Sequence, residues 1–123
     1  MKFYLASIIA ATSFFVASTS SAALVCKGAV QYKEIKAMYS AEISIKDLDT
    51  KSTLVSYSEF YNGQPAFKSG DHVMKASTTG EIEAISGSID AGVKSSFDAI
   101  VDLKNLTLKL KNAAITDFTC SKE

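Results

Sequence analysis

The sequence predicts an all-β fold, a small antiparallel β-barrel or β-sandwich with about eight strands in meander order. Three observations predict it. Apolar and polar residues alternate with a period of two along several segments, as in strands that bury one face. Turn-forming pairs separate these segments about every 8–12 residues, and they include Asn62-Gly63, Gly70-Asp71 and Thr79-Gly80. After the N-terminal apolar run, no segment has a convincing helical pattern longer than about two turns.

The N-terminus has the layout of a cleaved signal peptide. A positive start at Met1-Lys2 precedes an apolar run over residues 3–16, and small residues follow, with Ser20 and Ala22 at the −3 and −1 positions of a cleavage site. A retained membrane anchor needs about 20 apolar residues, and this run is shorter. We therefore expect residues 1–22 to be a signal peptide and residues 23–123 to be a single all-β domain. We also expect the mature chain to have no membrane span and to be exported, to the periplasm or the cell exterior.

The first three strands follow from residue parity. One parity of the first strand is mainly apolar and comprises Leu24, Cys26, Gly28, Val30 and Tyr32. A glycine within that set predicts a strand that is bent or thinned there. In residues 36–47 the inward parity comprises Ala37, Tyr39, Ala41, Ile43 and Ile45. Residues 53–61 carry apolar side chains on both parities, which predicts cover on both faces or a β-bulge.

The segment after Thr79-Gly80 is less regular. Ile82 and Ile85 differ in parity, whereas Ile85 and Ile89 agree. Because a strand that buries one face needs a single parity, we expect an irregularity near Ala84.

Residues 97–110 predict a hairpin with a two-residue turn at Lys104-Asn105. The inward set comprises Phe97, Ala99, Val101, Leu103, Leu106, Leu108 and Leu110. This turn places Val101 opposite Leu108 and, on the wet face, Asp98 opposite Lys111 as a favourable charge pair. A helical face over residues 96–104 is an alternative, but it does not explain why the alternation continues to residue 110.

Two cysteines lie near the two ends of the predicted domain. Cys26 is in the first strand, and Cys120 is in a last strand over residues 114–120, on the same face as Phe118. In an exported protein, two cysteines predict one disulfide. A redox pair or a metal site is less favoured because neither cysteine has a CxxC partner or a nearby histidine. Acylation of Cys26 is also a poor match, since Val25 precedes it.

Composition excludes several functional classes. The chain has 13 lysines, 13 acidic residues, one histidine, no arginine and no tryptophan. Balanced charge without arginine argues against a nucleic-acid partner, and so few Cys and His residues argue against a zinc module. We therefore expect no metal and no cofactor.

No catalytic constellation stands out, so we expect no enzymatic activity. His72 follows Ser69-Gly70-Asp71, but the sequence has no GxSxG elbow, and a surface turn residue is the favoured interpretation. Carboxylates in close pairs could bind a cation, although a solvated strand face or turn explains each pair as well. The pairs are Asp47 with Asp49, Glu81 with Glu83, and Asp98 with Asp102.

The remaining candidate site is aromatic. Tyr57, Phe60 and Tyr61 precede the Asn62-Gly63 turn, and clustered aromatics are common at binding surfaces. Tyr39 follows the inward parity, so we expect it in the core.

We therefore expect an exported, disulfide-bonded β domain that acts as a non-enzymatic binding module and is a monomer. Its partner would be a protein, a cell-envelope component or a small ligand, and inhibition of another enzyme is one concrete form. The alternative is a structural or assembly subunit of the cell surface, in which a strand is donated or accepted at an open edge. A small hydrolase that uses His72 is the least favoured hypothesis.

Overall fold

The computed structural model describes residues 23–34, 36–90, 94–111 and 113–123, which contain nine β-strands. The predicted signal peptide, residues 1–22, lies outside the described residues. The strands are β2 (Ala23–Tyr32), β3 (Ala37–Asp47), β4 (Ser52–Tyr61), β5 (Gln64–Lys68), β6 (His72–Thr79), β7 (Ile82–Asp90), β8 (Lys94–Asp102), β9 (Thr107–Leu110) and β10 (Asp117–Lys122). Within these residues, no helix is long and apolar enough to cross a membrane.

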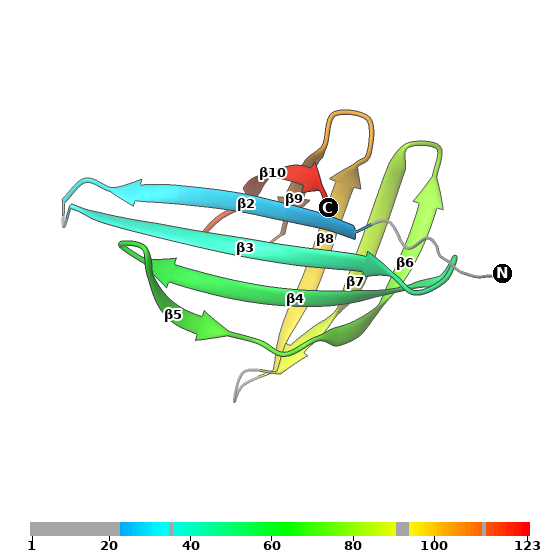
Figure 1. Cartoon of the computed structure of the whole chain (residues 1–123), viewed down its shortest axis with the longest axis horizontal. Helices are drawn as coiled ribbons and strands as arrows, with labels where there is room; N and C mark the ends of the chain where they lie inside the picture. The colour runs from blue at the N-terminus through cyan, green and yellow to red at the C-terminus, as the bar shows by residue number, and fades with distance from the viewer. Residues whose placement is uncertain (1–22, 35, 91–93, 112) are drawn as a thin grey trace, which may run out of the picture.

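Eight of the strands close into an antiparallel barrel, which decides between the two predicted architectures. The strands follow one another around the ring in meander order, and β10 pairs with β2 to complete it. On one edge β4 pairs with β3. On its other edge β4 pairs with β6 at its beginning and with β5 at its end. β5 is thus an extra strand beside the barrel (Figure 1).

Parity sets the interior of the barrel as predicted. Val101 lies opposite Leu108 and Ala99 opposite Leu110, which is the expected hairpin register, and all four side chains are buried. The inward residues of β3 also point to the core, where Ile43 and Ile45 are fully buried. An eight-stranded ring is just wide enough for side chains to fill, so much of this barrel is a packed core.

Gly28 thins β2, as predicted. A Cβ at this position would lie 2.7 Å from the backbone oxygen of Asp117 and 2.8 Å from Cγ2 of Ile115. The segment that enters β10 therefore packs directly on the bare backbone of β2.

The β4–β5 hairpin confirms two further predictions. Asn62 and Gly63 both have positive φ, 49° and 81°, as a type I′ turn requires, and Tyr61 pairs with Gln64 across the turn. The register of the two strands shifts between Glu59 and Phe60, which is the irregularity predicted for residues 53–61.

The prediction of an irregularity near Ala84 is wrong. β7 pairs in unbroken register with β8, and over its first half also with β6. The parity conflict is resolved by exposing Ile82, which is 41% accessible, and burying Glu83, which is 7% accessible. Glu81 lies in the turn before the strand. A solvated strand face or turn therefore explains Glu81 but is wrong for Glu83, which is buried.

Three smaller predictions need correction. The connection between β8 and β9 is a four-residue turn, residues 103–106, although its register is the predicted one. The last strand begins at Asp117, later than expected. Among the described side chains, Asp98 and Lys111 form no ion pair. Their contact is a backbone hydrogen bond from Lys111 to Asp98, and the ion pair present joins the exposed Lys109 and Asp117 at 3.2 Å.

The predicted disulfide closes the barrel. Cys26 and Cys120 are direct cross-strand partners of β2 and β10, with their Cα atoms 3.9 Å apart and their sulfurs bonded. Both side chains are buried in the core. The bridge therefore covalently joins the two strands whose pairing completes the ring.

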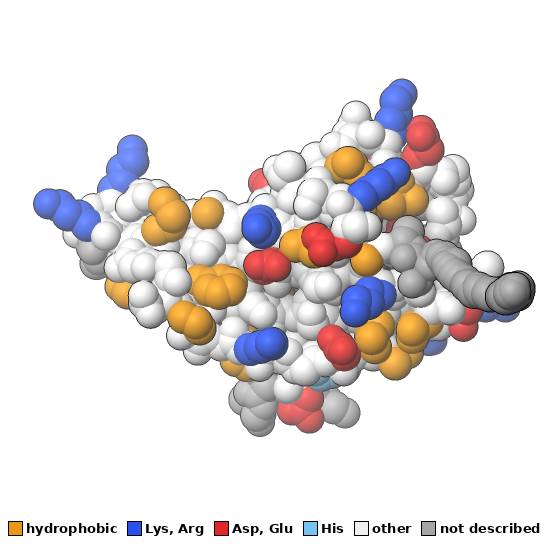
Figure 2. Space-filling view, viewed as in Figure 1, with side chains coloured by type: hydrophobic (Ala, Val, Ile, Leu, Met, Phe, Trp, Pro, Cys, Tyr) orange, Lys and Arg blue, Asp and Glu red, His pale blue; other side chains and the backbone are white. Residues whose placement is uncertain are grey.

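Part of the sheet extends past the barrel, and we call it the arm: residues 28–32 of β2, 37–41 of β3, 58–61 of β4, and β5. β10 pairs with β2 only over residues 24–27, and β6 pairs with β4 only over residues 52–55, so the arm lies outside the closed ring. The two hairpin ends of the arm project from one side of the molecule (Figure 1). On the face seen in Figure 2, lysines and acidic side chains are interspersed, and hydrophobic groups lie between them.

Candidate functional site

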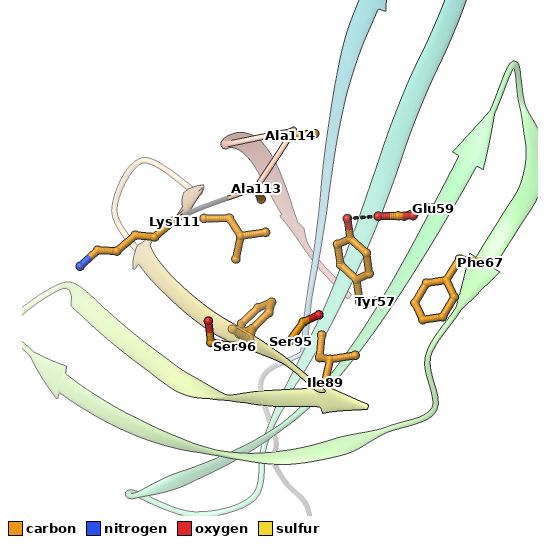
Figure 3. Close-up of a pocket in the computed structure, with 11 residues that line it drawn as sticks. Tyr57, Glu59, Phe67, Ile89, Ser95, Ser96, Lys111, Ala113 and Ala114 are labelled. Carbon is orange, nitrogen blue, oxygen red and sulfur yellow. Dashed lines mark hydrogen bonds between the residues drawn. The ribbon is translucent and has the colours of Figure 1, made fainter. Parts of the chain in front are cut away.

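A cavity of about 430 Å³ lies where the arm meets the end of the barrel. One wall comes from β4 and β5, and the other comes from β7, β8, β9 and the segment that leads to β10 (Figure 3). We call this end of the barrel the mouth. The lining residues are Tyr57, Glu59, Phe67, Ile89, Ser95, Ser96, Phe97, Leu110, Lys111, Ala113 and Ala114.

The polar centre of the cavity is a tyrosine–glutamate pair. The Tyr57 hydroxyl donates a hydrogen bond of 2.7 Å to Oε2 of Glu59, and the pair is visible in Figure 3. Tyr57 and Glu59 are two residues apart on β4, so both point to the inner face of the sheet. Phe67 of β5 is the cross-strand partner of Glu59. Its ring centroid lies 6.4 Å from that of Tyr57, at an interplanar angle of 48°.

Tyrosines mark the whole inner face around this pair. The register places Tyr61 beside Tyr39, and Tyr39 beside Val30. Tyr32 lies further along β2 with the same parity. All four tyrosines of the described residues therefore share one face, and exposure rises toward the tip of the arm, where Tyr61 is 47% accessible. Tyrosine combines a rigid apolar ring with a polar end, a combination that suits ligand contact.

The tyrosines nearest Glu59 are held in their neutral form. Burial raises the pKa of the Tyr57 hydroxyl, and the hydrogen-bonded Glu59 carboxylate raises it further. Burial also raises the pKa of Tyr39, and the nearby Glu59 carboxylate raises it further. A neutral hydroxyl is a hydrogen-bond donor, and Tyr57 donates its hydroxyl hydrogen bond to Glu59.

The three predicted aromatic site residues do not form one surface. Tyr57 lines the cavity. Tyr61 lies on the same inner face but nearer the tip of the arm. Phe60 has the opposite parity and lines a shallow hollow on the outer face, beside Ala29. Tyr39 is half-buried and packs against the core, close to the core position predicted for it.

Sequence reasoning missed Glu59 and Phe67 as members of the site. Parity alone places Glu59 beside Tyr57, a signal present in the printed sequence. Phe67 has no such signal, because its inward direction depends on the register shift between Glu59 and Phe60. The opposite wall could not be found from parity either, since it depends on how the barrel closes.

His72 and the carboxylate pairs lie apart from the cavity. The Nδ1 of His72 lies 2.8 Å from the backbone oxygen of Gly70, and the backbone N–H of Asp90 donates to Nε2 at 3.4 Å. Backbone groups thus engage both ring nitrogens at the start of β6. Among the described residues, no three His, Cys, Asp or Glu side chains lie close enough together to hold a metal ion.

Asp49 lies in the bend between β3 and β4, and Asp102 is the last residue of β8, directly before a turn. Asp49 accepts the backbone N–H groups of Lys51 and Ser52, and Asp102 accepts those of Lys104 and Asn105. Hydrogen bonds from these turn residues lower the pKa of both carboxyls. The role of these two acids is therefore explained by the turns whose backbone N–H groups they accept.

Glu83 faces the interior near the opposite end of the barrel. It lies near the start of β7, whereas Ile89, near the end of the same strand, lines the mouth cavity. Burial raises the pKa of Glu83, and the nearby Asp47 carboxylate raises it further.

No protein-family model, curated protein or solved structure matches this chain.

Proposed function

We propose that residues 23–123 form an exported, non-enzymatic binding module that holds a small ligand with an apolar body in the mouth cavity. The observation that carries the proposal is the cavity itself, about 430 Å³ in volume and placed at the mouth of a closed β-barrel. This volume lies within the usual range for ligand pockets, about 300–1,000 Å³, and barrel mouths are a common place for them.

The lining supports an apolar ligand with one polar end. Most of the wall is apolar, with Ile89, Phe97 and Leu110 on the barrel side and Phe67 on the arm. Polar groups are few. Two of them, Tyr57 and Glu59, are hydrogen-bonded to each other. A mainly apolar wall with a small number of fixed polar groups is typical of small-molecule sites, where the apolar area drives binding and the polar groups orient the ligand.

The scaffold supports both rigidity and export. The ring has eight strand pairings, and seven of them join strands that follow one another in the meander. The eighth, between β10 and β2, is joined covalently by the Cys26–Cys120 disulfide. A structural disulfide suits an oxidising compartment such as the periplasm or the cell exterior. A rigid ring behind the cavity reduces the entropy that binding would otherwise cost.

The test is the fluorescence of N-phenyl-1-naphthylamine, a neutral dye that brightens in apolar sites. We expect the mature domain to bind the dye at one saturable site. Ser95→Trp should abolish binding, because Ser95 lines the cavity but is itself exposed, so the larger side chain fills the space without displacing the core.

Ser86→Trp is the matched control. Ser86 is an exposed serine on the outer face of neighbouring β7, so this variant should bind the dye as the unchanged domain does. Circular dichroism confirms that both variants are folded. The proposal fails if the unchanged domain does not bind the dye, or if folded Ser95→Trp binds it equally well.

A further inference from the structure

We infer that the mouth cavity takes a ligand with a cationic amine, whose charged nitrogen lies between the Glu59 carboxylate and the rings of Tyr57 and Phe67. This inference rests on the proposed function and names the chemical class of its ligand. Three features of the cavity lead to it: an incompletely used carboxylate, a pair of converging rings, and a lysine directed elsewhere.

Glu59 has acceptor capacity to spare. A carboxylate offers about four lone-pair positions, and the Tyr57 hydroxyl uses one of them at Oε2. Glu59 is half-buried on the cavity wall and forms no ion pair with any cation whose side chain the structure describes. A partly desolvated carboxylate is stabilised by an opposite charge that also donates hydrogen bonds. A ligand ammonium group supplies both.

The two rings add a second attraction for positive charge. A cation is attracted to the face of an aromatic ring when it lies within about 6 Å of the ring centroid. The Tyr57 and Phe67 centroids are 6.4 Å apart, so one cation can lie within that range of both rings. Glu59 is hydrogen-bonded to Tyr57 and is the cross-strand partner of Phe67, so the charge and both rings converge on one corner. Because the raised pKa of Tyr57 keeps its hydroxyl protonated, the tyrosine adds no competing negative charge.

Lys111 does not fill this corner. It lines the cavity, but its side chain extends away from Tyr57 and Glu59, and its nitrogen lies at the left of Figure 3 while that pair lies at the right. The apolar part of the wall, with Ile89, Phe97 and Leu110, then faces the body of the ligand. The structure thus fits an amphiphilic amine, with its cation at the arm and its apolar body toward the barrel.

Three probes with the same aromatic body and different charge test the inference: 2-phenylethylammonium, 2-phenylethanol and phenylacetate. Each is titrated at pH 7 against the dye-loaded domain, and its Kd is obtained by displacement. We expect the ammonium to bind about tenfold more tightly than the alcohol, the range expected for one charge-assisted contact. Phenylacetate should bind most weakly because Glu59 repels it.

Two substitutions locate the effect. Glu59→Gln keeps the shape of the side chain and should bring the Kd of the ammonium and the alcohol to within about twofold, as expected when the ionic contact is lost. Phe67→Leu should weaken ammonium binding about threefold while changing the alcohol less, since a modest cation–π contact is lost. Glu81→Gln, in the exposed turn before β7, is the control and should keep the full preference.

The outcomes separate this inference from the proposed function. Equal affinity for ammonium and alcohol in the unchanged domain, or an unchanged preference in Glu59→Gln, overturns the cationic ligand, while dye binding still supports a small-molecule site. Failure of the dye and of all three probes to bind overturns both. Circular dichroism spectra of each variant exclude misfolding as the cause of lost binding.

Discussion

The two ends of the barrel give an inward-facing glutamate opposite surroundings. At the end opposite the mouth, Glu83 is 7% accessible, and burial and the Asp47 carboxylate raise its pKa. At the mouth, Glu59 is half-buried and accepts the hydroxyl hydrogen bond of Tyr57 beside an open cavity. One glutamate is enclosed against a like charge, and the other is supplied with a donor and free space. This difference is why we propose a binding role for Glu59 and none for Glu83.

The same contrast runs through the strands that carry the two ends. In the closed ring the inward parity is filled mainly by aliphatic residues together with Phe97 and Phe118, so side chains pack against each other across the ring. In the arm the same parity carries Tyr32, Tyr39 and Tyr61, and exposure rises toward the tip of the arm, where Tyr61 is 47% accessible. Stability and binding are therefore expected to depend on different residues, and the following substitutions test that separation.

The largest expected effect comes from the disulfide of the closed ring. The double variant Cys26→Ala/Cys120→Ala should lower the free energy of unfolding by about 3–5 kcal/mol, because the bridge restricts a long loop in the unfolded chain. The cysteines are 94 residues apart in the sequence. Urea unfolding followed by circular dichroism measures the change. Tyr61→Ala, at the exposed end of the arm, is the comparison and should cost well under half as much. Equal losses in the two variants would contradict the separation.

An intermediate effect is expected at Gly28. Gly28→Ala places a Cβ against the backbone oxygen of Asp117, which cannot move without shifting the chain, and should cost about 2 kcal/mol as an overpacked core does. Gly87→Ala is the comparison, because its Cβ would meet side-chain rather than backbone atoms, the nearest being Cγ of Met74 at 2.8 Å. Thermal unfolding should show a clearly lower midpoint for Gly28→Ala than for Gly87→Ala. The reverse order would show that β2 and β10 are less tightly packed than the structure indicates.

The smallest effect concerns the two glutamates. Glu83 has a higher pKa in the folded protein than in the unfolded protein, where it has the ordinary value of 4.5. Binding of its proton therefore stabilises the fold fully below pH 4.5, and this contribution is lost as the pH rises through the folded pKa. Glu83→Gln should therefore stabilise the domain at pH 7, by an amount on the order of 1 kcal/mol. The gain should shrink toward pH 4.

Urea unfolding at both pH values measures this gain, with Glu59→Gln as the comparison. Glu59 has a hydroxyl donor and open space, so Glu59→Gln should give no such gain. A lower free energy of unfolding for Glu83→Gln at pH 7 would show that the Glu83 carboxylate stabilises the fold.

Parity and turn chemistry were enough to predict much of the ring. The register of Ala99 and Val101 with Leu110 and Leu108 follows from alternation alone, and the turn at Asn62-Gly63 follows from two residues that tolerate positive φ. The disulfide follows from the count of cysteines in a chain expected to be exported. Each of these depends on local sequence or on a single long-range pair.

The rest depends on how distant segments meet. Burial of Glu83 could not be predicted because a polar residue at an inward position looks, in sequence, like a shifted parity. The cavity could not be predicted because its two walls come from β4–β5 and from strands beyond Ile89, and only closure of the ring brings them together. Phe60 and Tyr57 are near in sequence, which suggests one shared surface, yet strand geometry directs them to opposite faces.

The extra strand β5 has a consequence for how the molecule meets copies of itself. An exposed sheet edge is a template on which another chain can add a strand. β5 carries Pro65, which lacks the backbone N–H that an added strand would use, and its pairing with β4 is interrupted at Glu59 and Phe60. The free edge of β5 is thus poorly suited to strand addition, which disfavours assembly through this edge. The arm can hold its tyrosines open to solvent without making β5 a starting point for aggregation.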